Sequence, residues 1–333
     1  MKSLWTIPVV LISTGLISCS PPAPPASEGA QAFRVAAVFQ TAIEEPWDGV
    51  IHQACLKAKE ELGIEYEFTE KVAAADYEKV LREYAERGFD LIVGDAFLAG
   101  EEPVRRVAKE YPQIAFAFGS EFGPAAPNLS VFDNWIHEPA YLCGVIAGRL
   151  TKTGTIGAVA ALPIGEVNRL VNAFREGARS VRPDVKLKVS YIGSWFDPPK
   201  AKEAAIAQIE AGADLIFAER FGVYEACREK GVLAFSNMYD QHDMAPETII
   251  TGPVWDMGPT LRHCIETLRK GAWVGMDLKD WSMMAQGGAR LAPLHGFEQK
   301  LPADVLAAVR DLEAKIVRGS FRVPVDESKT VSD

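Results

Sequence analysis

From residue 33 onward, short runs of apolar, β-branched and aromatic residues alternate with amphipathic runs. The apolar runs are nearly continuous, which is typical of strands buried on both faces of a parallel sheet, and the amphipathic runs fit helices that cover such a sheet. In the first half we expect strands at 33–39, 64–70, 90–95, 113–119 and 129–135, with helices near 47–62, 76–87, 101–110 and 138–151.

The same alternation begins again at residue 155. We expect strands at 155–161, 186–192, 214–219, 232–237 and 248–255, with helices near 166–181, 198–211, 222–230, 258–270 and 302–318. A chain of 333 residues exceeds what one hydrophobic core usually supports. The sequence therefore predicts an α/β fold with two doubly wound parallel-sheet lobes.

The N-terminus has the features of an export signal. A positively charged start precedes an apolar run, 4–16, that is too short to span a bilayer and ends in LISC at Cys19. This end resembles the bacterial lipobox, so we expect 1–19 to be a lipoprotein signal peptide with Cys19 as the lipidated residue. Residues 20–32, rich in proline and alanine, would be a semi-stiff tether. A cleaved secretory signal with an incidental cysteine is the alternative.

Composition and motifs favour binding over catalysis. The net charge is −10 and there is no basic tract, which argues against nucleic-acid binding. Phosphate-binding loops, dinucleotide-binding glycine motifs, zinc-protease motifs and serine-hydrolase motifs are missing from the sequence, and the five histidines are scattered. We therefore expect no enzyme, no cofactor and no metal. The cysteines after Cys19 lie in expected helices, and we expect them to be buried free thiols.

Aromatic residues are frequent where the expected strands end. In doubly wound sheets, ligands bind outside the carboxyl ends of the strands. Rings that converge there would enclose a flat ligand, each contributing about 1–3 kcal/mol, although individual rings could simply seal the lobe edges. The aromatic residues at these positions are Trp47, Phe97, Trp135, Trp195, Phe196, Tyr239 and Trp255.

Several stretches resemble the basic membrane protein (BMP) family, whose members are substrate-binding lipoproteins of ABC importers, many of them carrying purine nucleosides. The resemblance covers roughly 33–325, and its clearest parts are 44–54, 88–118, 130–148, 191–205 and 238–252. It implies a type I periplasmic-binding-protein fold with a three-segment hinge, which we expect near 151–154, 252–256 and 284–288. Lobe 1 would then comprise 33–151 and 255–286, and lobe 2 would comprise 152–254 and 287–325.

The resemblance also implies roles for individual residues. Trp47 matches the aromatic residue that stacks on one face of the base, and Trp195 or Phe196 matches the residue on the other face, with Phe196 the closer match. Two residues after the fifth strand are candidates for contacting the base edge: Asp133 and Asn134.

The resemblance assigns the sugar contacts as well. Asp240 matches an aspartate that binds ribose hydroxyls. Trp255 stands where nucleoside-binding members commonly carry a lysine that contacts ribose. A ring there removes a sugar contact and fills sugar space, so we expect a free purine base, such as adenine, rather than a nucleoside.

Other functions stay open. The ligand could be a nucleoside, another heterocycle, a sugar or an autoinducer. The protein could instead be a nucleoside-metabolising enzyme or an adhesive surface lipoprotein. The favoured interpretation implies a monomer outside the cytoplasm, held to the membrane by its lipid anchor, with an ABC permease and its ATPase as partners.

Overall fold

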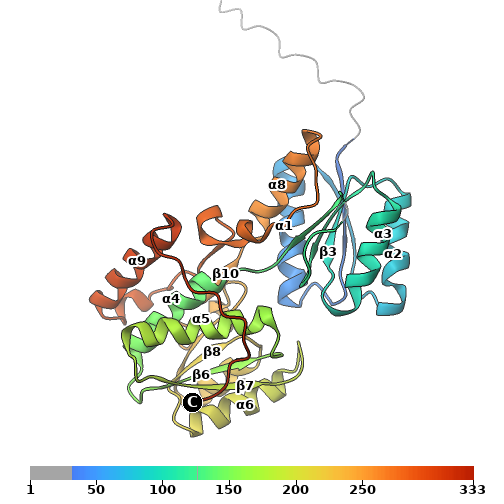
Figure 1. Ribbon diagram of the computed structural model, residues 1–333. Helices are drawn as coiled ribbons and strands as arrows, with labels where there is room; N and C mark the ends of the chain where they lie inside the picture. The colour runs from blue at the N-terminus through green and yellow to red at the C-terminus, as the bar shows by residue number, and fades with distance from the viewer. Residues whose placement is uncertain (1–31, 126) are drawn as a thin grey trace, which may run out of the picture. The chain divides into compact units, whose positions relative to one another are not determined.

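The computed structural model describes residues 32–125 and 127–333 (Figure 1). The expected signal peptide, the lipidated Cys19 and the tether up to residue 31 lie outside the described residues. Two parallel sheets, each covered by helices, make up the unit Phe33–Asp333. No helix among the described residues has the length and apolar character that crossing a membrane requires.

The first sheet has five parallel strands in the order β2-β1-β3-β4-β5. One face packs against α1 and α8, and the other against α2 and α3. Successive residues of β1 alternate between these two apolar clusters, which explains the continuous apolar runs. The strands are β1 Arg34–Val38, β2 Glu65–Thr69, β3 Leu91–Asp95, β4 Ala115–Gly119 and β5 Leu129–Phe132; the helices are α1 Pro46–Leu62, α2 Ala74–Glu86, α3 Glu101–Glu110 and α8 Gly258–Arg269.

The second sheet has four parallel strands in the order β7-β6-β8-β9. Helix α5 packs against one face, and α6 and α7 pack against the other. The strands are β6 Thr155–Ala160, β7 Lys186–Tyr191, β8 Leu215–Ala218 and β9 Leu233–Phe235; the helices are α4 His137–Leu150, α5 Gly165–Val181, α6 Pro198–Glu210, α7 Val223–Lys230 and α9 Ala303–Val317. Two doubly wound parallel sheets are the architecture that the hydrophobic pattern predicts.

Helix α4 belongs with the second sheet, whereas the sequence pattern assigns it to lobe 1. Its backbone lies directly against α5: a Cβ at Gly144 would be 2.0 Å from the carbonyl oxygen of Phe174, and one at Gly177 would be 2.0 Å from that of Tyr141. The chain therefore leaves the first sheet at 133–136, before α4. The expected hinge segment 151–154 is instead a turn within the second half, where Asp214 accepts hydrogen bonds from Thr151, Lys152 and Thr153.

An antiparallel pair of short strands, β10 Pro253–Trp255 and β11 Ala289–Leu291, carries the other two crossings. The expected strand 248–255 is therefore much shorter. Ile249 makes a single bridge to Ala234 of β9, and the chain then turns away at Gly252, where a Cβ would lie 2.1 Å from Ser236 Oγ. The remaining short elements are 3₁₀ helices: η1 Leu98–Gly100, η2 His242–Met244, η3 Lys279–Ser282, η4 Met284–Gln286 and η5 Phe297–Gln299.

The thiols after Cys19 are buried and free, as the sequence predicts: Cys55, Cys143, Cys227 and Cys264. Burial raises the pKa of each of these thiols, which keeps them protonated and unreactive.

Candidate ligand-binding site

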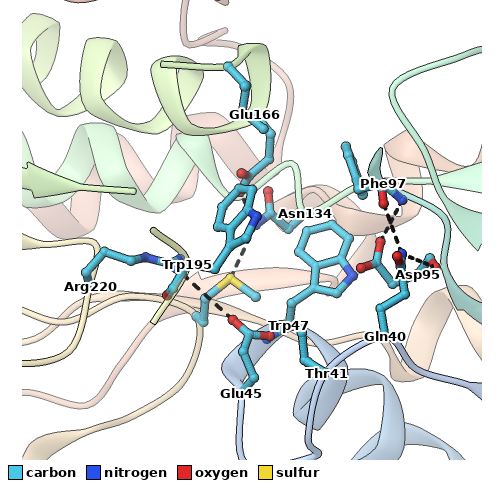
Figure 2. Close-up of a pocket in the computed structure, with 12 residues that line it drawn as sticks. Gln40, Thr41, Glu45, Trp47, Asp95, Phe97, Asn134, Glu166, Trp195 and Arg220 are labelled. Carbon is cyan, nitrogen blue, oxygen red and sulfur yellow. Dashed lines mark hydrogen bonds and ion pairs between the residues drawn. The ribbon is translucent and has the colours of Figure 1, made fainter. Parts of the chain in front are cut away.

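A cavity with about 680 Å³ of empty space, open to solvent, lies at the carboxyl ends of the strands of both sheets (Figure 2). The first sheet contributes the loops after β1, β3 and β5, and the second sheet contributes the loops after β6, β7, β8 and β9. This is the place where doubly wound sheets bind ligands. The lining residues are Gln40, Thr41, Glu45, Trp47, Asp95, Phe97, Asn134, Ile164, Glu166, Trp195, Arg220 and Met238.

Aromatic rings from both halves form its walls. Trp47 lies in the first turn of α1, with Pro46 before it at the helix start. The Trp47 ring packs edge-to-face on Phe97, with centroids 5.3 Å apart, and against Trp255 at 4.8 Å. Trp195, from the loop after β7, belongs to the other half. The cavity can therefore contact a flat ring from both lobes.

Three carboxyl groups line the cavity, from Glu45, Asp95 and Glu166. Burial raises the pKa of all three, and for Glu166 the pKa reaches about 8. Asp95 Oδ1 accepts from the backbone N–H of Phe97 at 2.9 Å. Behind the lining, burial raises the pKa of Asp48 to about 7. Burial thus disfavours the ionised form of each of these carboxyl groups.

Two lining atoms are buried without a hydrogen-bond partner among the described residues: Asn134 Oδ1 and Trp47 Nε1. The Asn134 amide nitrogen is already engaged, since it donates to Glu166 Oε1 at 2.6 Å and to Met238 Sδ at 3.2 Å. A buried polar atom left unpaired costs about 1–3 kcal/mol. A ligand that offers one donor and one acceptor would remove that cost.

Arg220 is the cation among the described lining residues. Its Nε donates to Glu219 Oε2 at 2.9 Å, and its Nη1 donates to the carbonyl oxygen of Trp195 at 2.9 Å. The same Nη1 lies 3.8 Å from Glu45 Oε1 in the other half. Because Arg220 is neutralised by these carboxylates, it offers little charge to an anionic ligand. In the described part of the chain, no group of three metal-ligating side chains could hold a metal ion.

Four of the expected site residues meet in this cavity: Trp47, Phe97, Asn134 and Trp195. Phe196 does not join them, because its ring is 62% exposed and packs edge-on against Phe221. The structure thus brings Trp195, and not its neighbour, opposite the first half.

Asp133 and Trp135 line a neighbouring cavity instead. Asp133 pairs with the buried Arg169, whose guanidinium also lies 4.4 Å from the centre of the Trp135 ring. Lys279 Nζ lies 5.1 Å from the same ring. These three contacts are internal to the protein, so Asp133 and Trp135 stabilise the connector 133–136.

Asp240, expected to bind ribose, lies outside the cavity lining, and so does Trp255, whose ring therefore does not fill sugar space in this cavity as expected. Asp240 Oδ2 is 2.6 Å from Nε2 of His295, near the surface. Trp255 is buried behind Trp47, and its Nε1 donates to Ser282 Oγ at 3.1 Å.

Sequence reasoning identifies one polar lining residue, Asn134, and misses the others. The loop position of Glu45 suggests a solvated carboxylate, yet Glu45 caps α1 by accepting from the N–H groups of Trp47 and Asp48. Gln40 and Arg220 follow β1 and β8 closely, and Asp95 is the last residue of β3, so position at a strand end is a signal for polar residues as much as for aromatic ones. Glu166 lies in the first turn of α5, and Met238 lies beyond the end of β9.

Comparisons with known proteins identify the family. The family model described as ABC transporter substrate-binding protein PnrA-like (Bmp) matches residues 34–285. A purine-binding protein of Brucella abortus is 32% identical over 280 residues, which cover 83% of this chain and 78% of that protein. A protein of Haloferax volcanii, named as a putative ABC transporter glucose-binding protein, is 38% identical over 216 residues. That match covers 63% of this chain and 54% of the relative, about half of its length.

A solved structure gives the same result. An ABC transporter solute-binding protein from Conexibacter woesei has a TM-score of 0.71 at 25% identity, covering 88% of this chain and 99% of that one. The expected periplasmic-binding-protein fold is therefore confirmed. Because the family model matches well over half of the sequence and the Brucella relative is similar along most of it, the chain belongs to the Bmp (PnrA-like) family of ABC transporter substrate-binding proteins.

Proposed function

We propose that the protein captures a free purine base, such as adenine, outside the cytoplasm and delivers it to the permease of an ABC importer. The observation that carries this proposal is the combination, in one cavity, of aromatic walls from both halves with a buried unpaired acceptor and a buried unpaired donor. A purine is flat, and its rim presents both N–H donors and ring-nitrogen acceptors.

The polar groups favour a ligand whose rim carries both N–H donors and acceptors. Asn134 Oδ1 is an unpaired acceptor, and Asp95 and Glu166 each direct a carboxyl group into the same cavity. Trp47 Nε1 supplies one donor. A site built to pair N–H groups rejects ligands that lack them, because its buried acceptors would stay unpaired. The relative named for purine binding supports the same ligand class.

A base fits the cavity better than a nucleoside. Ribose would bring hydroxyl groups that need partners, and Asp240, the residue to which the family resemblance assigns that role, is engaged elsewhere. Asp240 is paired with His295, and Trp255 is buried against Trp47. The lysine of nucleoside-binding relatives has no equivalent at Trp255.

Capture works by closing the two halves over the ligand. Trp47 belongs to the first half and Trp195 to the second, so a ring held between them contacts both. Only the closed arrangement makes both contacts, and this difference in affinity shifts the population toward closure. The closed form is the one that the permease would recognise.

Export and lipidation complete the proposal. The apolar run 4–16 and Cys19 would direct the chain out of the cytoplasm and anchor it, while 20–32 would hold the binding unit away from the membrane. A Cys19→Ala variant should shift the protein from the membrane fraction to the soluble fraction. Retention of that variant in the membrane fraction would contradict the anchor.

Calorimetric titration with adenine, adenosine and glucose tests the ligand. We expect adenine to bind with the lowest Kd. Tighter binding of adenosine would show that the ligand is a nucleoside and not a free base. Tighter binding of glucose would show that the ligand is a sugar, as in the name of the Haloferax relative. Trp195→Ala should weaken adenine binding, and Phe196→Ala is its matched control in the same loop.

A further inference from the structure

A pair of buried, oppositely charged side chains connects the two halves of the protein at the binding cavity. Glu45 begins α1 on the first sheet's side, and Arg220 follows β8 of the second sheet. Their charged groups approach to 3.8 Å, between Glu45 Oε1 and Arg220 Nη1 (Figure 2). The side chains are only 12% and 9% exposed, so solvent screens this pair weakly.

Each partner also positions one aromatic wall. The other oxygen of Glu45 accepts from the N–H of Trp47 at 2.8 Å and thereby fixes the first turn of α1, which carries the Trp47 ring. Arg220 donates to the carbonyl oxygen of Trp195 at 2.9 Å, and its guanidinium lies 5.4 Å from the centre of the Trp195 ring. The pair therefore connects the two rings that would enclose the ligand.

Arg220 is itself held rigidly in the second half. Its Nε donates to both the side chain and the carbonyl oxygen of Glu219, at 2.9 and 2.8 Å. Glu219 is fully buried and accepts from the N–H of Ala161 at 2.9 Å. The guanidinium cannot swing away from the cavity, so its separation from Glu45 depends on the distance between the two halves.

We propose that Glu45 and Arg220 are positioning residues that form an ion-pair bridge across the cleft and set the width of the slot between Trp47 and Trp195. At 3.8 Å the bridge is longer than a hydrogen bond, which leaves room for it to shorten when a thin ring draws the walls together. The bridge gives the closed state a contact between the two halves of the protein, in addition to the contacts that each half makes with the ligand. It slows ligand release and leaves diffusion into the site unchanged.

This inference rests on the proposed ligand site, and two variants test it. Glu45→Gln keeps an oxygen that can cap α1 but removes the charge that faces Arg220. Glu44→Gln makes the same chemical change one residue earlier, on an exposed side chain, and controls for net charge. Stopped-flow measurement with adenine should show a release rate about tenfold faster for Glu45→Gln, an association rate within about twofold of wild type, and no change for Glu44→Gln.

A rescue variant separates the bridge from a purely structural role. Glu45→Asp keeps both the charge and a good helix cap, so its release rate should fall between those of wild type and Glu45→Gln. If the bridge acts on the cleft, the Tm values of wild type, Glu45→Asp and Glu45→Gln should not rank in the same order as their release rates. A release rate for Glu45→Gln equal to that of wild type would overturn the proposal.

A ligand-free measurement keeps the proposal testable if adenine does not bind. Small-angle scattering of the unliganded protein should give a larger radius of gyration for Glu45→Gln than for Glu44→Gln, because the halves lose a contact across the cleft. Equal radii would overturn the bridge. Failure of wild-type protein to bind adenine would instead overturn the ligand assignment, and the scattering measurement alone would then decide whether the bridge exists.

Discussion

The buried carboxyl group of Glu166 should make the protein less stable as the pH rises. Its Oε1 accepts from Asn134 Nδ2 at 2.6 Å. Burial is the main cause that raises its pKa from 4.5 to about 8; Asp133 and Glu219 add to the rise, and Arg169 opposes it. Between these two pKa values the folded protein holds a proton that the unfolded chain releases, so folding becomes less favourable with increasing pH.

Glu166→Gln isolates this effect. Glutamine has nearly the same shape and can still accept from Asn134, but it cannot ionise. At pH 7 the substitution should stabilise the folded protein by at most about 3 kcal/mol. This value is the difference between pH 7 and the unfolded pKa of 4.5, multiplied by about 1.4 kcal/mol per pH unit. For a chain of this length that corresponds to a rise in Tm of roughly 5 °C. Near pH 4.5 the two proteins should have almost the same Tm.

Scanning calorimetry of wild type and Glu166→Gln at pH 4.5 and pH 7 measures the difference. Glu203→Gln, an exposed carboxylate on α6, is the matched control and should change Tm little at either pH. A Glu166→Gln variant that is no more stable than wild type at pH 7 would refute the buried, protonated carboxyl group. An equal gain at both pH values would assign the effect to packing instead of ionisation.

Further measurements address the walls, the connector and the thiols. Trp195→Ala should raise the Kd for adenine roughly 10- to 100-fold, the value of about 1–3 kcal/mol for a stacked ring, whereas Phe196→Ala should leave the Kd unchanged in calorimetric titration. Arg169→Leu leaves Asp133 buried without its cation and should cost about 3–5 kcal/mol in urea unfolding; Glu327, half exposed, can be removed at much lower cost. A thiol reagent should modify the following cysteines only after denaturation: Cys55, Cys143, Cys227 and Cys264.

The hydrophobic pattern was sufficient to predict the sheets. Strands that are buried on both faces give unbroken apolar runs, and the expected strands at 33–39 and 155–161 enclose β1 and β6 closely. The same pattern could not assign α4 to a lobe. Every residue from 137 to 148 is buried, so the helix has no polar face that indicates which sheet it covers. Its position depends on the close approach of Gly144 and Gly177 to α5, which is a property of two helices together.

The site was only partly predictable for a similar reason. Position after a strand indicated Trp47 and Trp195 as walls, because the carboxyl ends of parallel strands share one edge. It could not choose between Trp195 and Phe196, which are neighbours in one loop. The hydrogen bond from Arg220 to the Trp195 carbonyl fixes that loop, and Arg220 is distant in sequence. Pairing between remote charges leaves no local pattern in a single sequence.

The placement of the cavity also explains how a small ligand could change the angle between the halves. Asn134, which lines the cavity and whose Oδ1 is buried and unpaired among the described residues, lies in the first crossing, at 133–136. Trp255 of β10, in the second crossing, packs against Trp47, and its Nε1 donates to Ser282 of η3, which precedes the third crossing at β11. The first two crossings therefore contact the cavity or the Trp47 ring that walls it. A ligand that moves Trp47 or pairs Asn134 acts directly on the segments that must bend, so coupling between occupancy and closure requires no pathway through the lobes.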